Sequence, residues 1–157
     1  RRTALLVAIE EADRDKISTL LGREEVDINA RDQSGQTALM LAIQSSQTMS
    51  WLVDDLLKIK GIDVNAQDQS GRTALMVTIK AKNWSSFFNL LDTKNVDVNA
   101  RDGTGQTALM LVTQTPYFID CSRYAKILLR RNDVNVNALD SHQQTALMWL
   151  LQRQPEK

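Results

Sequence analysis

A four-residue motif, Thr-Ala-Leu followed by Met or Leu, recurs five times along this chain and constrains its fold more than any other feature. The copies begin at Thr3, Thr37, Thr73, Thr107 and Thr145, so their spacings are 34, 36, 34 and 38 residues. A nearly constant period between roughly 20 and 50 residues is typical of proteins built from stacked repeats. Because one such repeat cannot bury its apolar face alone, we expect successive repeats to stack and share a continuous core.

Further motifs keep the same phase. A tetrapeptide of the form Asp-Val-Asn-Ala, with Ile in the first copy and an initial Asn in the last, occupies the segments 27–30, 63–66, 97–100 and 135–138. A pair of leucines precedes each tetrapeptide, at 20–21, 56–57, 90–91 and 128–129. After each tetrapeptide an aspartate and a glycine recur three residues apart: Asp32 and Gly35, Asp68 and Gly71, Asp102 and Gly105, and Asp140 with Gln143 in place of glycine. The shared phase indicates that every repeat has the same internal structure.

The residue types predict that structure. Threonine is a good helix N-cap, and the Ala, Leu and Met that follow it are strong helix formers. Leu39, Ala42 and Ile43 then lie on one face of a short first helix, and a second helix ends at the leucine pair. The glycine before each threonine suits a turn residue with a positive φ. Each repeat is therefore predicted to be two helices joined by a turn, followed by an extended loop, called the finger below, that carries the tetrapeptide.

This arrangement resembles the ankyrin repeat, a unit of about 33 residues with a β-turn and two helices. The threonine motif stands where the family has Thr-Pro-Leu-His, so Ala replaces Pro and Met or Leu replaces His in all five copies. Methionine cannot make the hydrogen bonds of that histidine, so we expect it to pack in apolar contacts instead. The family's glycine between the two helices is also missing here.

The resemblance implies an all-α fold, an ankyrin-type solenoid with extended finger loops that forms a single domain. It would contain four full repeats and a C-terminal half repeat, spanning about 1–30, 31–66, 67–100, 101–138 and 139–157. The chain begins with Arg1 at the threshold of a repeat and ends halfway through another. We therefore expect it to be a fragment of a longer protein.

The composition argues against several classes of function. The 157 residues include 19 basic and 19 acidic side chains, whereas nucleic-acid binding driven by counterion release favours a basic surplus. The single cysteine fits a reducing intracellular compartment, cytoplasmic or nuclear. No apolar run reaches the roughly 18 residues of a membrane-spanning helix. We expect neither a nucleic-acid partner nor a membrane span, and nothing in the sequence indicates an oligomeric state.

The side chains that usually carry chemistry are scarce. One histidine, His142, and one cysteine, Cys121, do not make a convincing pair of base and nucleophile. A zinc site needs several such ligands at short spacing, and no glycine-rich phosphate-binding loop is present. The aspartates recur once per repeat, which suits turn hydrogen bonds rather than paired acid–base work. We predict no catalytic residue, no metal and no cofactor, and we expect His142 to be a solvated turn residue or a contact residue.

Ankyrin proteins usually bind through the finger tips and the exposed side of the first helices. The resemblance therefore implies a protein–protein interaction module whose partner is another protein or a peptide. The residues at those positions form a polar row rich in amides, which can both donate and accept hydrogen bonds. The predicted partner-binding residues are Arg31, Gln33, Ser34, Gln36, Gln44, Gln67, Gln69, Ser70, Arg72, Lys80, Arg101, Thr104, Gln106, Gln114 and His142.

Two alternative functions stay open. The chain could be a regulatory or substrate-docking segment of a larger enzyme whose catalytic domain lies outside it. It could also bind a charged small molecule or an oligonucleotide through Arg72, Lys80 and Arg101, although the neutral net charge argues against this.

Two further expectations concern single residues. In animals, ankyrin finger asparagines with a leucine eight positions upstream resemble substrates of an asparaginyl hydroxylase. Four asparagines have that spacing here and are candidates for hydroxylation: Asn29, Asn65, Asn99 and Asn137. Trp84 is expected to pack within or between repeats rather than anchor a partner. The apolar insertion at Pro116, Tyr117 and Phe118 is either a contact loop or folds back over its own helices.

Overall fold

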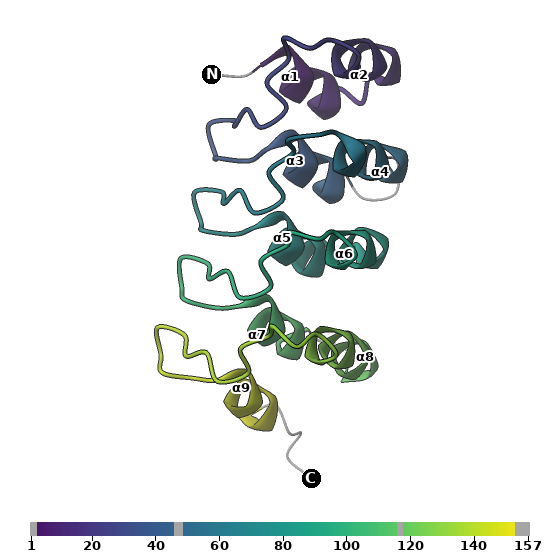
Figure 1. The fold of residues 1–157 in the computed structure, drawn as a ribbon. Helices are drawn as coiled ribbons and strands as arrows, with labels where there is room; N and C mark the ends of the chain where they lie inside the picture. The colour runs from purple at the N-terminus through teal and green to yellow at the C-terminus, as the bar shows by residue number, and fades with distance from the viewer. Residues whose placement is uncertain (1–2, 46–48, 116–117, 153–157) are drawn as a thin grey trace. The chain divides into compact units, whose positions relative to one another are not determined.

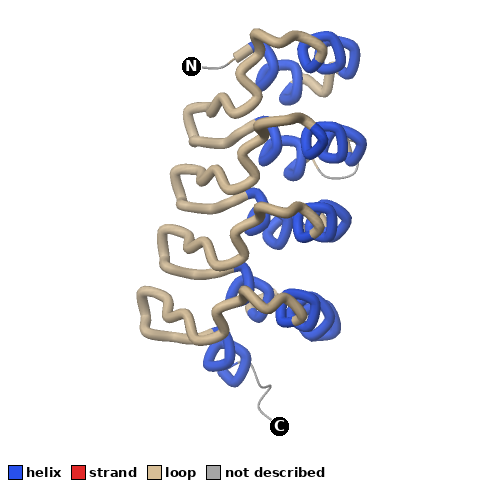
Figure 2. The backbone as a smooth tube through the Cα atoms, viewed as in Figure 1, coloured by secondary structure: helices blue, strands red, loops and turns tan. Residues whose placement is uncertain are grey.

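The computed structural model describes residues 3–45, 49–115 and 118–152, and the chain divides into two compact units, Arg1–Val96 and Asp97–Lys157. The helices of the first unit are α1 (Ala4–Glu10), α2 (Arg14–Leu21), α3 (Ala38–Gln44), α4 (Ser50–Lys58), α5 (Ala74–Ala81) and α6 (Trp84–Leu91). Those of the second are α7 (Ala108–Thr113), α8 (Phe118–Leu129) and α9 (Ala146–Gln152). Within each unit the fingers project to one side of the helices (Figures 1 and 2). The predicted all-α architecture of short helices and extended loops is confirmed in the described residues.

The first helix of every repeat begins directly after its threonine, as the motif predicts. The Thr3 hydroxyl accepts a hydrogen bond from Leu6 N at 3.5 Å, and Thr37 caps Met40 N at 3.4 Å. Thr73 and Thr107 occupy the same position with extended backbone but make no side-chain cap bond. Helix initiation at those two repeats therefore depends on packing of the apolar face rather than on the cap.

The core of the first unit lies between its stacked helices. Each first helix packs against its own second helix, α3 lies between α1 and α5, and α4 packs against α6. The buried faces come from the residues that the motif repeats: Leu39, Met40 and Ile43 of α3 are all 0 % exposed. This agrees with the expectation that a repeat buries its apolar face only by stacking on its neighbours.

In the second unit α7 packs against both α8 and α9. The methionines at the family's histidine position are buried at Met40, Met76 and Met110, as expected for apolar packing. The expectation is wrong for Met148, which is 45 % exposed on α9. The physical reason is that no second helix covers α9 among the described residues, whereas α7 lies against α8.

The turn between the two helices contains non-glycine residues in the left-handed conformation. The resemblance would place glycine there, but Ala12 and Lys82 adopt the left-handed conformation instead, with φ of 56° and 55°. A residue with a Cβ pays a steric penalty in this region that glycine does not. The sequence alone indicates only that the glycine is missing.

Replacing Ala12 by glycine is therefore expected to stabilise the fold. The gain should be about 0.5–1 kcal/mol, because the penalty for a left-handed Cβ exceeds the extra chain entropy that glycine loses on folding. Urea denaturation followed by circular dichroism would measure it. The matched control is Ala4→Gly, at the exposed start of α1, which should destabilise the protein by a similar amount because its backbone is helical. A loss of stability in both variants would contradict the prediction.

Candidate functional site

Each finger contains a turn that its aspartate closes. Asp32 Oδ1 accepts hydrogen bonds from the backbone N–H groups of Ser34 at 2.7 Å and Gln36 at 2.8 Å. The same two bonds form at the three other aspartates: Asp68, Asp102 and Asp140. The interpretation of these residues as turn-stabilising groups, rather than as an acid–base array, is confirmed.

Two of these aspartates use their second oxygen as well. Asp68 Oδ2 accepts from Arg72 Nε at 2.9 Å and lies 2.8 Å from Arg72 Nη2, and Asp140 Oδ2 accepts from Trp149 Nε1 at 2.8 Å. Burial opposes ionisation of both carboxyl groups. The hydrogen bonds outweigh burial and lower both pKa values, chiefly from Arg72 at Asp68 and from the Gln144 backbone and Trp149 at Asp140.

Three of the four finger asparagines, Asn29, Asn65 and Asn99, connect their finger to the loop of the next repeat. Asn29 donates from Nδ2 to Gly61 O at 2.8 Å, and its Oδ1 accepts from Asp63 N at 2.8 Å. Asn99 in the second unit does the same with Asp133 O at 2.6 Å and Asn135 N at 2.7 Å. Asn65 donates to Asn95 O at 2.7 Å, and the Asn137 backbone donates to Asn135 Oδ1 at 3.0 Å. Hydroxylation of the four asparagines stays a prediction.

Six of the predicted partner-binding residues use their side chains to brace the fingers. Arg31 donates to Gln67 O at 2.9 Å and Gln69 to Gln33 O at 2.7 Å, which ties the first finger to the second. The other four bond within a finger or to the neighbouring one: Gln67 to Gly71 O, Arg72 to Asp68, Arg101 to Gly105 O and Leu139 O, and Thr104 to Asp102. Their polar atoms are therefore largely committed to the fold.

A second set stays available to a partner. Gln33, Ser34, Gln44, Ser70 and Lys80 are exposed, and no side-chain hydrogen bond or ion pair involves them in the part of the chain that the structure describes. All five belong to the first unit, on two fingers and at the ends of α3 and α5. The Gln69 N to Ser34 O hydrogen bond of 2.9 Å holds the two finger turns side by side. The resemblance to ankyrin repeats implied that these residues lie in one row with the six bracing residues, and it did not distinguish the two sets.

The remaining predicted residues are less accessible or lie in the second unit. Gln36, Gln106 and Gln114 are half-buried, and Gln114 Nε2 is a buried atom without a hydrogen-bond partner among the described residues. His142 is exposed, with Nδ1 3.4 Å from Ser141 Oγ, as expected for a solvated turn residue.

Lys80 is the most distinctive of the available residues. Residues 74–79 of α5 are all buried, and Lys80 follows them as the one exposed residue of the helix. Gln44 holds the same repeat position at the end of α3 and is also exposed. An exposed ammonium group can bind carbonyl and carboxylate oxygens, and exposed amides and hydroxyls can both donate and accept hydrogen bonds. The exposed set therefore offers hydrogen-bond donors and acceptors and one ammonium group to a polar chain.

The aromatic side chains of the first unit pack rather than project. Trp84 is half-buried, and its ring meets Phe87 edge-on at a centroid distance of 5.9 Å. Phe87 itself is 0 % exposed. These contacts confirm the packing interpretation of Trp84. The insertion at Pro116 and Tyr117 lies outside the described residues.

Two kinds of feature are missing from the described ranges. No group of three or more His, Cys, Asp or Glu side chains in them could hold a metal ion. None of the described helices is both long and apolar enough to cross a bilayer.

Comparison with known proteins agrees with the repeat architecture. The family model described as ankyrin repeats (3 copies) matches residues 5–102, which is more than half of the chain. No curated protein matches the sequence.

Proposed function

Because this chain belongs to the ankyrin repeat family, whose members are generally protein-interaction modules, we propose that it binds a partner protein or peptide through the first unit. The binding face consists of Gln33, Ser34, Gln44, Ser70 and Lys80, called the polar face below. One observation carries the proposal: the fingers are braced by their own side chains, while this set is exposed and has no side-chain partner among the described residues.

The bracing bears directly on affinity. Two backbone turns that are held by the Gln69 N to Ser34 O bond and by the Arg31 and Gln69 side chains do not have to order on binding. A preformed surface loses less conformational entropy when a partner arrives. The exposed amides suit hydrogen bonds to a peptide backbone, and Lys80 suits a carboxylate. The proposed partner is therefore an extended polar segment with an acidic residue placed to meet Lys80.

The side-chain contacts give less support to the alternative function, binding of a charged small molecule or an oligonucleotide. Of the three cations that would form such a site, Arg72 pairs with Asp68 at 2.8 Å and Arg101 donates to Gly105 O at 3.0 Å. Lys80 is then the only one of the three whose side chain makes no hydrogen bond or ion pair in the described part of the chain. Because binding of a polyanion increases with the number of phosphates neutralised, one available cation is a poor basis for it.

A double substitution, Gln44→Ala with Lys80→Ala, tests the proposed face. It should weaken binding of a purified partner by about tenfold or more, the range expected when a contact set worth about 1.4 kcal/mol is removed. Isothermal titration calorimetry on a partner first recovered with the wild-type protein would measure the change. Neither residue is buried, so the thermal midpoint should stay the same.

The matched control is Lys126→Ala, which removes an exposed lysine from α8 of the second unit. That variant should bind like wild type. Equal affinity of the double variant and the wild type would reject the polar face as the binding surface. Arg72→Ala and Arg101→Ala are poor tests, because loss of binding in them would also follow from disturbed fingers.

A further inference from the structure

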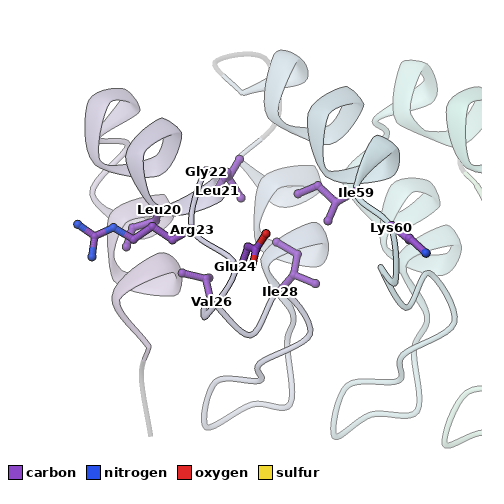
Figure 3. A pocket seen from close by; sticks show the side chains of 9 residues that line it. All are labelled: Leu20, Leu21, Gly22, Arg23, Glu24, Val26, Ile28, Ile59 and Lys60. Atoms are coloured by element: carbon purple, nitrogen blue, oxygen red, sulfur yellow. The ribbon is translucent and has the colours of Figure 1, made fainter.

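A groove of 470 Å³ lies in the first unit, and none of its lining residues belongs to the polar face. It is lined by Leu20, Leu21, Gly22, Arg23, Glu24, Val26 and Ile28 of the first repeat and by Ile59 and Lys60 at the end of α4 (Figure 3). Its size is within the range of roughly 300–1,000 Å³ that ligand pockets in proteins occupy. Five of its nine lining residues are branched apolar side chains.

The burial of the apolar lining residues differs between this junction and the third repeat. Val26 and Ile28 are half-buried, whereas the residues at the same positions of the third repeat, Val96 and Val98, are 5 % and 3 % exposed. Leu20 is half-buried too, while its counterpart Leu56 is 0 % exposed. Apolar surface that the third repeat buries is left partly accessible here, as it is at Ile62 of the second repeat.

The sequence of α2 accounts for the difference. Lys16 holds the position that Leu52 fills in α4, where the leucine is 0 % exposed. Lys16 stays exposed and pairs with Asp13 at 2.9 Å. Consequently α2 contacts α4 less than α4 contacts α6. The Arg14 guanidinium over the Trp51 ring, 4.7 Å from its centroid, joins α2 to α4 near their first residues, at the opposite end from the groove.

Three charged residues, Arg23, Glu24 and Lys60, belong to the lining, and Glu24 is the acidic one. Figure 3 shows the Glu24 side chain beside Ile28 in the middle of the group, with Arg23 and Lys60 at its opposite ends. Arg23 is paired with Glu25 at 3.9 Å, and Glu24 has no ion-pair partner among the described residues. Glu24 also differs from its counterparts, because Lys60 and Lys94 hold the same position in the next two repeats. Its negative charge is therefore specific to this junction.

We propose that this groove is a second docking site, which takes an extended peptide segment of a partner protein that carries a lysine or arginine next to a branched apolar side chain. The apolar residue lies against Val26, Ile28 and Ile59. The aliphatic stem of the basic residue covers more of that surface while its charged head meets Glu24, since long basic side chains readily combine the two contacts. The Glu24 carboxylate would repel an acidic residue placed next to it.

The test selects a phage-displayed heptapeptide library on the wild-type chain, with a Glu24→Lys variant as the counter-target. Lysine already occupies this position in the second and third repeats, so the variant should fold normally. Selected peptides should combine Lys or Arg with Leu, Ile, Val or Met. Fluorescence polarisation should show binding at least tenfold weaker to Glu24→Lys and several-fold weaker to Val26→Thr, which keeps the shape of the lining but not its apolar character.

Two controls separate this site from the polar face. Lys94→Glu makes the reverse charge change at the same position of the third repeat and should leave binding unchanged. Gln44→Ala with Lys80→Ala should also leave peptide binding unchanged. The two proposals are therefore tested independently, and either one can be rejected without the other. The proposal is overturned if the library yields no enrichment over the counter-target, if enriched peptides bind Glu24→Lys as tightly as wild type, or if they are acidic.

Discussion

Replacing Asp68 by alanine is expected to destabilise the protein by about 3 kcal/mol, because it removes a buried acceptor that serves several donors at once. The side chain is 1 % exposed and accepts hydrogen bonds from the backbone of Ser70 at 2.8 Å and Arg72 at 2.9 Å, and from the Arg72 guanidinium. Its removal leaves these donors without their acceptor in a site that water reaches poorly. Urea denaturation at neutral pH, followed by circular dichroism, would measure the loss.

Asp32→Ala is the matched control, because Asp32 makes the same two backbone bonds but is half-buried and binds no arginine among the described residues. Water can replace its bonds in part, so a loss of about 1 kcal/mol is expected. Equal losses in the two variants would show that the second oxygen of Asp68 and its arginine contribute nothing to stability.

Asp68 also predicts how the stability of the protein depends on pH. Its pKa in the folded protein lies below the ordinary value of about 3.9 for aspartate. The stability it contributes is therefore present above that ordinary value and is lost as the pH falls from there through the lowered pKa. The free energy of unfolding should drop less steeply below about pH 4 in Asp68→Ala than in wild type. Parallel curves for the two proteins would contradict the assignment.

Gly35→Ala is expected to lower the free energy of unfolding by about 3 kcal/mol, because two unfavourable effects add at this position. The residue has a φ of 75°, where a Cβ is disfavoured by itself. A Cβ there would also lie 2.9 Å from Gln69 N and 3.2 Å from Asp68 C, which are backbone atoms of the next finger and cannot move aside cheaply. The contact would push apart two fingers that the Gln69 N to Ser34 O bond holds together. Differential scanning calorimetry would record the lowered midpoint.

Gly61→Ala separates the two effects. Gly61 has a φ of 88° but nothing within 4 Å of an added Cβ, so only the backbone penalty of about 1 kcal/mol applies. A Gly35→Ala variant that is no less stable than Gly61→Ala would show that the two fingers are not in tight backbone contact. Partner binding through the polar face should suffer in Gly35→Ala and not in Gly61→Ala.

Much of the repeat could be predicted because its signals are local. The threonines begin every first helix, and the glycines Gly35, Gly71 and Gly105 have positive φ at the predicted turn. Such preferences depend on a residue and its near neighbours in the chain, so sequence spacing is enough to find them. The turn between the helices was harder, because Ala12 and Lys82 are forced into a left-handed conformation that their residue types do not favour.

The candidate site was predictable only in outline. The resemblance to ankyrin repeats implied fifteen binding residues in one row, but Arg31 and Gln69 brace neighbouring fingers through backbone acceptors 36 positions away in sequence. Every residue has a backbone carbonyl, so the residue types of the next repeat do not reveal which carbonyl accepts a hydrogen bond. The sequence therefore cannot show whether an arginine side chain is bonded within the protein. The groove could not be predicted for a similar reason, since it depends on how closely α2 approaches α4.

The amino-acid sequence by itself determined the repeat period, the helices with their caps, the turn residues and the family, because each of these depends on short-range chemistry that recurs in phase. Only the tertiary structure decided which polar residues hold the fingers together and which remain exposed to a partner. That division depends on distances between repeats, which determine whether a side chain closes a hydrogen bond within the protein or is left to bind another molecule.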